Sequence, residues 1–384
     1  MLRLLARMRP HAMPVTYRHN RVALFPDGPH FFQGLLAALR SAERMILLEY
    51  YTIKGDHAGS ALAAELIAAV KRGVRVLLIY DYIGCIDTPS VYFKNLSRHG
   101  IELIPFNVPS FRRGIHWFDR RNHRKMTIID SRVALLGGFN IADEYAGEGM
   151  LRNRFRDLGF SVSGSVVQEL ISSFGDIWQM ECDERPDLKA VCGQRQGKRH
   201  PGDANVAIIS GGPHQRRSSI RSAFLFNIAS ASEELLVANP YFVPGPRIIR
   251  SLLRASRRGV RVRLLMTARS DVPLVQLVGR SFYGILLRGG IDIFEMEQQL
   301  LHAKVMLVDG ERTVIGSANL DQRSFHRNFE INCVIDSGAF GAQIRSELEV
   351  DFLAARRVTL DRHEGRGLIL RGVEKIVNLF SWFL

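Results

Sequence analysis

The chain has few cysteines and no long apolar run, and each shortage excludes a class of protein. Its four cysteines lie far apart among 384 residues and form no CxxC pair, so a zinc site built from such pairs is not expected. So few cysteines in a long chain are typical of free thiols in a reducing compartment. A membrane-spanning helix takes roughly 20 apolar residues, and the sequence offers no such segment.

Acidic residues are outnumbered by basic ones. There are 38 Asp and Glu against 52 Lys and Arg, which gives a formal net charge of +14. This balance predicts a polyanionic partner, either nucleic acid or an anionic membrane, and charge alone does not separate the two. Hydrophobic residues make up 46% of the chain, enough for the core of two domains or of one large duplicated domain.

Both ends of the chain combine basic and apolar residues. The N-terminal arm, residues 1–20, begins MLRLLARMRPHAMP, which suits either a basic helix at a membrane surface or a disordered start. The C-terminal tail, residues 356–384, has apolar residues at helical spacing that are interrupted by Arg371, Glu374 and Lys375. We expect an amphipathic helix there, lying either on a membrane or on the protein core.

The sequence repeats itself at a spacing of 190 residues. AERMILLEYYTI from Ala42 resembles SEELLVANPYFV from Ser232, and HGIELIPF from His99 resembles GGIDIFEM from Gly289. Each half reads strand, helix, strand, helix, strand, which predicts two α/β halves with mixed, largely parallel sheets. The expected first half is 21–183, the linker is the polar stretch 184–205, and the second half is 206–355.

One motif occurs once in each half. HRKMTIID, residues 123–130, and HAKVMLVD, residues 302–309, share the order His-x-Lys, four residues, Asp. Six residues later each continues with Gly-[Gly/Ser]-x-Asn, ending at Asn140 and Asn319. A single His-x-Lys is weak evidence, but two copies at this spacing inside a wider repeat indicate a shared function.

About eleven additional residues precede the motif of the first half. They include the basic and aromatic stretch FRRGIHWFDRR, residues 111–121. Such an insertion suits either a substrate entrance or a solvated surface loop.

The residue types in the motif suit phosphodiester chemistry at one site shared by the halves. One histidine would attack phosphorus, and the other, protonated, would protonate the leaving oxygen. Lysine and asparagine would stabilise charge on the phosphate oxygens. The expected catalytic set is His123, Lys125, Asn140, His302, Lys304 and Asn319. No dense carboxylate cluster accompanies the motifs, so neither a catalytic metal nor another cofactor is expected.

Four acidic residues near the motifs fall into two groups. Asp157 and Glu330 follow the motifs and are candidates for orienting the histidines, with surface ion pairs to neighbouring arginines as the alternative. Asp130 and Asp309 lie an odd number of positions from the motif lysines, so in a straight strand they face away from the site. We interpret these two as structural residues that hold the turn and the neighbouring backbone.

The paired motifs resemble the HKD motifs of the phospholipase D superfamily. The stretches LLEYYTI, NPYFVPG, GGFNIADEY and GSANLDQRSFHRNFE are similar to those of bacterial cardiolipin synthases, and the resemblance extends from about Asn20 to Phe352. It implies transfer of a phosphatidyl group from one phosphatidylglycerol to another, through a phosphatidyl-histidine on His123 and with release of glycerol. His302 would be the acid and base. The resemblance further implies that Glu330 orients His123 and Asp157 orients His302, each across the interface.

The same resemblance implies the binding partner and the cellular location. We expect peripheral attachment to an anionic phospholipid membrane containing phosphatidylglycerol and cardiolipin, at the cytoplasmic face of the bacterial cell membrane. Many such synthases begin with two membrane-spanning helices, and this chain resembles the subgroup without them. No nucleic-acid partner is expected, and an oligomer is compatible with the sequence.

Three further residues are predicted to bind substrate. Tyr51 and Tyr241 are candidates for an apolar wall that excludes water, as are Tyr50 and Phe242, although core packing explains these residues equally well. Ser317 is the third, and Gly138 at the matching position implies one fewer hydroxyl near the first histidine. The alternatives to a synthase are a hydrolytic phospholipase D, a nucleic-acid phosphodiesterase and a lipid-binding scaffold with a decayed site.

Overall fold

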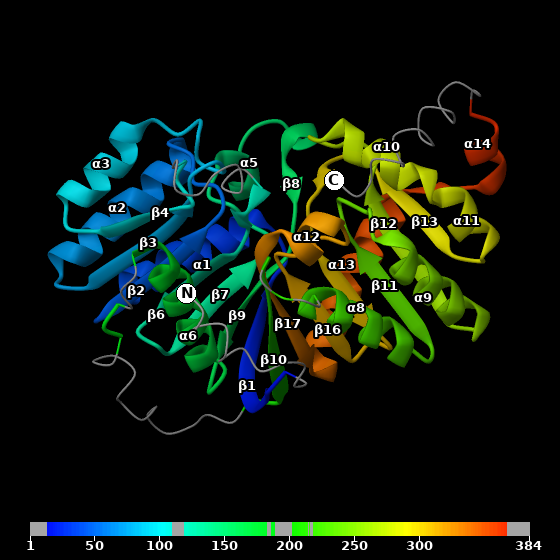
Figure 1. Ribbon diagram of the computed structural model, residues 1–384, viewed down its shortest axis with the longest axis horizontal. Helices are drawn as coiled ribbons and strands as arrows, with labels where there is room; N and C mark the ends of the chain where they lie inside the picture. Colours follow the sequence, from blue (N-terminus) through cyan, green and yellow to red (C-terminus); the bar gives the residue numbers. More distant parts are fainter. Residues whose placement is uncertain are drawn as a thin grey trace.

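One sheet runs through both halves of the chain. The computed structural model describes residues 14–109, 119–182, 186–188, 202–213, 215 and 218–366. In the described part, the sheet places neighbouring strands side by side across the whole molecule (Figure 1). The strand order is β18 (Arg356–Val358), β13 (Asp292–Met296), β12 (Arg261–Thr267), β11 (Glu234–Ala238), β15 (Val305–Val308), β16 (Arg312–Gly316), β17 (Asn328–Asp336), β10 (Ala204–Gly211), β1 (Thr16–Phe25), β9 (Gly159–Ser163), β7 (Val133–Gly137), β6 (Lys125–Ile129), β2 (Met45–Tyr50), β3 (Arg75–Asp81) and β4 (Glu102–Phe106).

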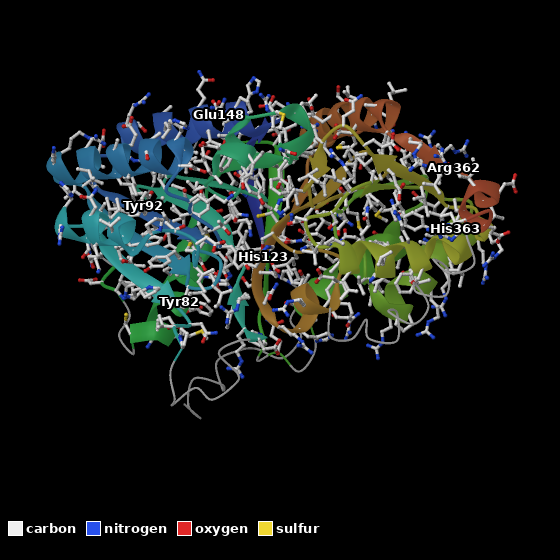
Figure 2. The ribbon with its side chains drawn as sticks, turned by 90° about the horizontal axis from the view of Figure 1, so that it is seen from above. Tyr82, Tyr92, His123, Glu148, Arg362 and His363 are labelled. Carbon is white, nitrogen blue, oxygen red and sulfur yellow. The ribbon has the colours of Figure 1, made fainter. Side chains whose placement is uncertain are left out.

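Helices cover both faces of this sheet (Figures 1 and 2). Strands such as β2 and β11 are buried along their whole length, because a sheet covered on both sides needs apolar residues on both faces. The helices are α1 (Gly28–Ser41), α2 (His57–Lys71), α3 (Ser90–Arg98), α5 (Asp143–Ala146), α6 (Val167–Cys182), α8 (Ser219–Ser230), α9 (Gly245–Arg257), α10 (Pro273–Ser281), α11 (Tyr283–Arg288), α12 (Gln322–His326), α13 (Gly338–Ala354) and α14 (Leu360–Glu364).

The predicted duplication is present as two halves with the same strand directions. Strands β2, β3 and β4 run parallel to one another, as do β11, β12 and β13. The mixed sheets are therefore confirmed, but the expectation that they are largely parallel is corrected. In each half the motif strand pairs antiparallel with the first parallel strand and continues through antiparallel neighbours.

Tight turns explain this antiparallel part. Asp130 and Ser131 have φ of 51° and 57° between β6 and β7, and Asp309 and Gly310 have φ of 50° and 73° between β15 and β16. Two consecutive residues with positive φ are typical of the turns that join hairpin strands. An Asp-Gly pair, as at residues 309–310, favours such a turn because glycine and aspartate tolerate positive φ.

The two halves join through the centre of the sheet. β1 pairs antiparallel with β9 of the first half and with β10, which in turn pairs with β17 of the second half. The expected boundaries therefore shift at three places. Residues 16–20 belong to the sheet and not to an N-terminal arm, residues 204–205 begin β10, and residues 356–358 form an edge strand. The assignment of the linker between the two halves to the region near residues 184–205 stays a prediction.

Asp130 and Asp309 hold the turns and the backbone beside them. The Asp130 carboxylate accepts hydrogen bonds from the backbone N–H groups of Glu43, Arg44 and Met45, at 2.8–2.9 Å. The Asp309 carboxylate does the same for residues 232–234. Both lie at the end of the motif strand opposite the histidine, as the alternation of side chains predicts.

Candidate active site

Two very short strand pairs bring the motifs of the two halves together. β5 (Arg121–Asn122) of the first half lies parallel to the start of β17, and His123 N–H donates to the carbonyl of Phe329 at 2.9 Å. Symmetrically, β14 (Leu300–Leu301) of the second half lies parallel to β8 (Phe155–Arg156), and His302 N–H donates to the carbonyl of Arg156 at 2.8 Å. Each motif histidine is thereby fixed to the residue that precedes the opposite half's carboxylate. Seen from above, His123 lies near the middle of the molecule (Figure 2).

His123 meets Glu330. Nδ1 of His123 lies 3.0 Å and 3.1 Å from the two carboxylate oxygens of Glu330. Ser317, Ser324 and Asn328 also donate to this carboxylate. Burial raises the pKa of Glu330, but His123 and Lys125 outweigh it and hold the pKa below its usual value. Burial lowers the pKa of His123 despite the attraction of Glu330, so a neutral imidazole faces an ionised carboxylate.

His302 meets Asp157. Nδ1 of His302 lies 2.6 Å from Asp157 Oδ2, and Asp157 also accepts the Leu158 N–H at 2.8 Å. Burial, followed by the charge of Lys304, lowers the pKa of His302 to about 4, although Asp157 opposes the shift. For Asp157, burial raises the pKa, but Lys304 and His302 outweigh it and lower the pKa. The predicted pairing of each histidine with the carboxylate of the other half is therefore present in the structure.

Both motif lysines are buried beside their histidines. Lys125 Nζ donates to the carbonyl of His123 at 2.7 Å, and Lys304 Nζ donates to the carbonyl of His302 and lies 3.0 Å from its Nδ1. Burial lowers the pKa of Lys125 to about 7, and the charge of Lys304 contributes to this shift. Burial likewise lowers the pKa of Lys304 to about 8. A bound anion would restore the charged form of both ammonium groups.

The motif asparagines are buried near the histidines of the site. Asn140 accepts from the Thr52 N–H at 3.3 Å and donates to the hydroxyl of Tyr145 at 3.0 Å. The backbone N–H of Asn319 donates to Ser324 Oγ at 3.0 Å. Asn319 Oδ1 is buried and has no hydrogen-bond partner among the described residues. This oxygen is therefore available to accept a hydrogen bond from a ligand hydroxyl.

The predicted wall residues separate into two groups. The Tyr51 ring meets His123 edge to face at a centroid distance of 5.0 Å, and Lys125 Nζ lies 5.2 Å from the centre of the same ring. Tyr241 donates its hydroxyl to Asp271 at 2.5 Å. By contrast, Tyr50 and Phe242 belong to the hydrophobic cores of the two halves, and the Tyr50 hydroxyl bonds to Thr127. Core packing explains these two, whereas Tyr51 borders the site.

The expectation about Ser317 and Gly138 is corrected. The Ser317 hydroxyl is fully buried and donates to Glu330 at 2.5 Å, so it supports the carboxylate of the first histidine and does not face a substrate. A Cβ at Gly138 would lie 2.2 Å from an oxygen of Asp157. The missing hydroxyl therefore belongs to the surroundings of His302, the second histidine. The error arose because each carboxylate serves the histidine of the other half.

Sequence reasoning missed Tyr145 and Ser324. Tyr145 Oη lies 3.3 Å from His302 Nε2, and Ser324 Oγ donates to Glu330 at 2.9 Å. Both residues come five positions after the motif asparagine of their half. That shared spacing within GGFNIADEY and GSANLDQRSF was the available signal.

Some predicted segments lie outside the described residues. These are residues 110–118 of the insertion, most of the linker, the first 13 residues and the C-terminal helix from residue 367 onward. Of the insertion, Asp119 pairs with Arg327 at 2.7 Å and Arg121 pairs with Asp81 at 3.3 Å. Within the part of the chain that the structure describes, no helix is long and apolar enough to cross a bilayer.

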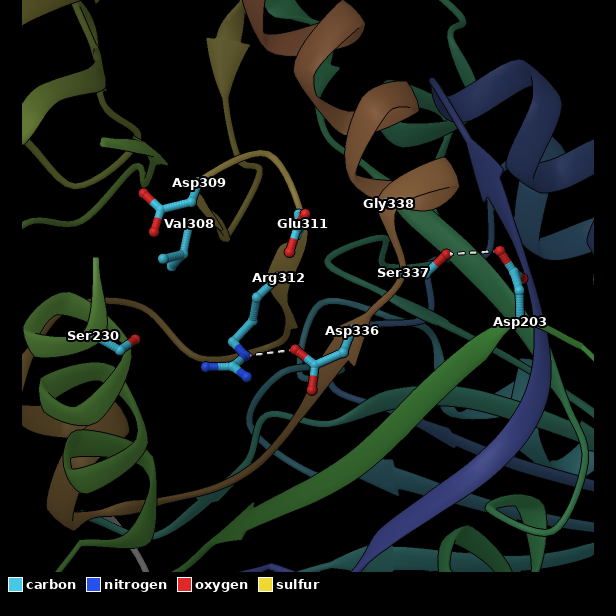
Figure 3. A pocket seen from close by; sticks show the side chains of 9 residues that line it. All are labelled: Asp203, Ser230, Val308, Asp309, Glu311, Arg312, Asp336, Ser337 and Gly338. Carbon is cyan, nitrogen blue, oxygen red and sulfur yellow. Dashed lines mark hydrogen bonds and ion pairs between the residues drawn. The ribbon is translucent and has the colours of Figure 1, made fainter. Parts of the chain in front are cut away.

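A surface pocket lies elsewhere, beside the β15–β16 turn (Figure 3). It encloses about 530 Å³. Its lining includes Asp309 and the Arg312–Asp336 ion pair, and the Ser337 hydroxyl beside it donates to Asp203 at 3.2 Å. No histidine, lysine or asparagine of the motifs lines this pocket, so it is separate from the candidate active site.

Comparison with known proteins agrees with this geometry. The chain matches the family described as cardiolipin synthase, PLD-like domain, over residues 35–178 and 225–352. It is 34% identical to a cardiolipin synthase of Geobacillus kaustophilus over 391 residues, which cover 99% of this chain and 75% of that protein. It is 33% identical to cardiolipin synthase A of Pseudomonas syringae over 370 residues, which cover 94% of this chain and 75% of that protein.

A solved structure shares the fold. Phosphatidylserine synthase of Haemophilus influenzae superposes with a TM-score of 0.72 over 95% of each chain, at 12% sequence identity. At that identity the likeness shows the fold alone. The family resemblance of the two motifs is thus confirmed, and the chain belongs to the cardiolipin synthase family of phospholipase D-like phosphatidyltransferases.

Proposed function

We propose that this chain transfers a phosphatidyl group from one phosphatidylglycerol to a second one, forming cardiolipin and releasing glycerol. The observation that carries the proposal is the crossed pairing of His123 with Glu330 and of His302 with Asp157 around two buried lysines. Two histidines with separate orienting carboxylates can divide nucleophilic and acid–base work. The membership in the cardiolipin synthase family supports phosphatidylglycerol as the substrate.

The first half of the reaction would form a phosphatidyl-histidine. Nε2 of His123 bonds to phosphorus while the bond from phosphorus to the leaving glycerol oxygen breaks, and that oxygen takes a proton from His302, whose protonated form the negative charge of the bound phosphodiester would favour. Glu330 accepts the Nδ1 proton of His123, so the lone pair of Nε2 points away from the carboxylate. The lowered pKa of His123 favours the neutral ring that this attack requires.

The second half would return the enzyme to its starting state. A hydroxyl of the second phosphatidylglycerol gives its proton to His302, its oxygen bonds to phosphorus, and the electron pair of the N–P bond returns to His123. Lys125, Lys304, Asn140 and Asn319 are proposed to stabilise negative charge on the phosphate oxygens in both steps. Tyr51, beside His123, and Tyr241 are proposed to line the path of the substrate.

The exposed apolar side chains at the site's edge of the sheet support peripheral attachment to a membrane. Loops that follow parallel strands meet at the same edge, and Tyr51, the residue after β2, places His123 there. We call the exposed apolar residues of these loops, and of the helical turns that directly follow them, the apolar rim: Ile86, Val91, Met150, Leu151, Val272 and Leu274. With the net charge of +14, this rim suits the cytoplasmic surface of an anionic cell membrane, which is the proposed location.

The product formed from phosphatidylglycerol vesicles tests the proposal. We expect cardiolipin and glycerol in equal amounts, and loss of both with His123→Ala or His302→Ala in a protein that stays folded. Phosphatidic acid without cardiolipin would contradict the transfer and identify a hydrolytic phospholipase D. An active His302→Ala variant would contradict the shared site.

A further inference from the structure

The residue before each motif histidine has a different environment in the two halves. Asn122, which precedes His123, is polar and fully buried, whereas Leu301, which precedes His302, belongs to the hydrophobic core. Both are the second residue of a two-residue strand that pairs with the opposite half. A buried amide needs hydrogen-bond partners and a leucine does not, so the two histidines are held in place by different forces.

The hydrogen bonds of Asn122 reach two strands of its own half. Its backbone N–H donates to Asp81 Oδ2 at 2.8 Å, and its Nδ2 donates to Glu49 Oε1 at 2.7 Å. Asp81 is the last residue of β3, Glu49 lies in β2, and both are fully buried. Across the interface, Asn122 pairs with Phe329 of β17. Asn122 therefore ties the sheet of the first half to the strand of the second half that carries Glu330.

Two buried arginines lie beside these carboxyl groups. Arg121 Nη1 lies 3.3 Å from Asp81 Oδ1, and Arg124 Nη1 lies 3.8 Å from Glu49 Oε1. Burial raises the pKa of both carboxyl groups, and the arginines oppose the shift. Hydrogen bonds in such a buried group fix distance and direction more narrowly than apolar contacts do. We call the following residues the buried polar network: Glu49, Asp81, Arg121, Asn122 and Arg124.

The matching positions of the second half hold no such network. The register of the sheet places Ala238 at the position of Glu49 and Thr267 at that of Asp81. The motif spacing matches residues 121, 122 and 124 with Leu300, Leu301 and Ala303. None of these five residues of the second half carries a charge. The buried polar network is therefore specific to the motif of His123.

We propose that Asn122 is a positioning residue for His123 in the phosphatidyl transfer proposed above, on which this inference rests. Held by Glu49 and Asp81, Asn122 fixes the backbone that carries the His123 ring. An attacking nitrogen must lie in line with the bond that breaks, so a small displacement of this ring lowers the rate. His302, the acid and base of the reaction, is held by apolar packing instead.

Replacement of Asn122 by the residue of the second half tests the proposal. Asn122→Leu removes the hydrogen bond to Glu49 and leaves the catalytic side chains unchanged. Asn227→Leu is the matched control, because Asn227 is also a buried asparagine and its Nδ2 donates to the carbonyl of Ala223 within α8. Both variants lose one buried amide, but only the first lies in the buried polar network.

Asp81→Asn tests the same contact from its other side and keeps the size of the side chain. Asp81 Oδ1 accepts from the N–H groups of Ile83 and Gly84, and Oδ2 accepts from the Asn122 N–H. An amide has a single acceptor oxygen, which the two loop N–H groups would hold, so its NH₂ group would face the Asn122 N–H. This variant decides the question if Asn122→Leu does not fold.

The hydrogen bond from His123 to Glu330 reports the position of the ring in the absence of lipid. NMR of protein with labelled histidine follows the Nδ1–H signal of His123, which is assigned by its loss in His123→Asn. We expect this signal to shift in Asn122→Leu and in Asp81→Asn, while the ring signals of His302 stay in place. Asn227→Leu should leave the signals of both histidines unchanged. An unchanged His123 signal in the folded network variants would overturn the proposal.

The kinetic constants on phosphatidylglycerol vesicles test the effect on the reaction. We expect kcat to fall about 100-fold in Asn122→Leu while KM stays within about twofold of the wild type, because alignment matters most in the transition state. Asn227→Leu should keep the wild-type kcat. Equal losses of kcat in the two variants, or a change confined to KM, would overturn the proposal. The NMR measurement uses no lipid, so a protein that makes no cardiolipin would refute the proposed function and leave the NMR result standing.

Discussion

At the scale of the residue, the two orienting carboxylates are held in different ways. Three side chains besides His123 donate to Glu330, and one of them is Ser317. Asp157 has a close neighbour in Gly138, where no side chain fits. Asp157, with the shorter side chain, lies against the bare backbone of Gly138, and Glu330, with the longer one, lies against the Ser317 hydroxyl. Both carboxylates lie within hydrogen-bonding distance of their histidines.

Gly138→Ser should therefore damage the site more than Ser317→Ala. A Cβ at position 138 would lie 2.2 Å from Asp157, so the carboxylate must move away from His302. We expect cardiolipin formation to fall about 100-fold or more, as for loss of a hydrogen bond to a charged group that sets a tautomer. Ser317→Ala removes one of several donors, and we expect about a tenfold loss. The rate of cardiolipin formation by each variant is measured on the same vesicles. Equal losses of rate in the two variants would contradict the prediction that Gly138→Ser is the more damaging.

The buried lysines predict a pH dependence of anion binding. The pKa of Lys125 is about 7 and that of Lys304 about 8 in the free protein, so both ammonium groups lose their protons as the pH rises through this range. A cation attracts the phosphodiester only below its pKa, so binding should weaken from pH 6 to pH 9. Glycerophosphoglycerol keeps one negative charge throughout, and its inhibition constant measures the effect. A constant independent of pH would count against charged lysines in the site.

At the scale of the element, two-residue strands decide where the catalytic groups lie. The N–H of Leu300 in β14 donates to the carbonyl of Arg154 at 3.0 Å, beside the pairing with β8 that delivers Asp157. Leu301 of β14 belongs to the hydrophobic core, and Phe155 of β8 packs against the core of the first half. The strand pair also fixes one half against the other at the site.

Leu300→Pro should therefore reduce activity without unfolding the protein. Proline has no N–H to donate, so the β14–β8 pair loses a hydrogen bond and Asp157 loses its register with His302. We expect at least a tenfold loss of cardiolipin formation with a change of only a few degrees in the melting temperature. Leu300→Ala, which keeps the N–H, is the control and should retain most of the activity. A large fall in melting temperature would show a structural role instead.

The sequence predicted the long elements and the residues of the site better than their connections. The halves and the motif residues were predictable because the repeat is long and the motif spacing is kept in both copies, whereas the crossed carboxylates were expected only from the family resemblance. The strands β5 and β14 are too short to leave a periodic pattern. The positions of Ser317 and Tyr145 depend on which carboxylate meets which histidine, and that is set by packing between halves distant in the chain.

At the scale of the whole molecule, the apolar rim and the active site share one edge of the sheet. Met150 and Leu151 come from the first half and Val272 and Leu274 from the second, and all are 40–58% exposed. Phe155, which follows the first pair in the chain, packs against His302. A bilayer that contacted the rim would therefore lie at the same edge of the sheet as the histidines.

Two double variants of the apolar rim should weaken binding to phosphatidylglycerol vesicles. They are Met150→Ser/Leu151→Ser and Val272→Ser/Leu274→Ser. Each removes apolar area that we expect to enter the bilayer, and about tenfold weaker binding is expected for each. Phe226→Ser/Ile285→Ser, on α8 and α11, removes exposed apolar area away from the rim and is the control. Vesicle flotation measures the binding. Equal binding by rim and control variants would argue against insertion of the rim.

The junction of β9, β1, β10 and β17 makes the two halves one continuous body, and this bears on how the site became asymmetric. A pair of identical subunits must carry the same residue at equivalent positions. One continuous chain is free of that constraint, and here position 138 differs from 317, 145 from 324 and 157 from 330. A single chain can therefore give its two motif histidines different surroundings, which two identical subunits related by symmetry cannot do.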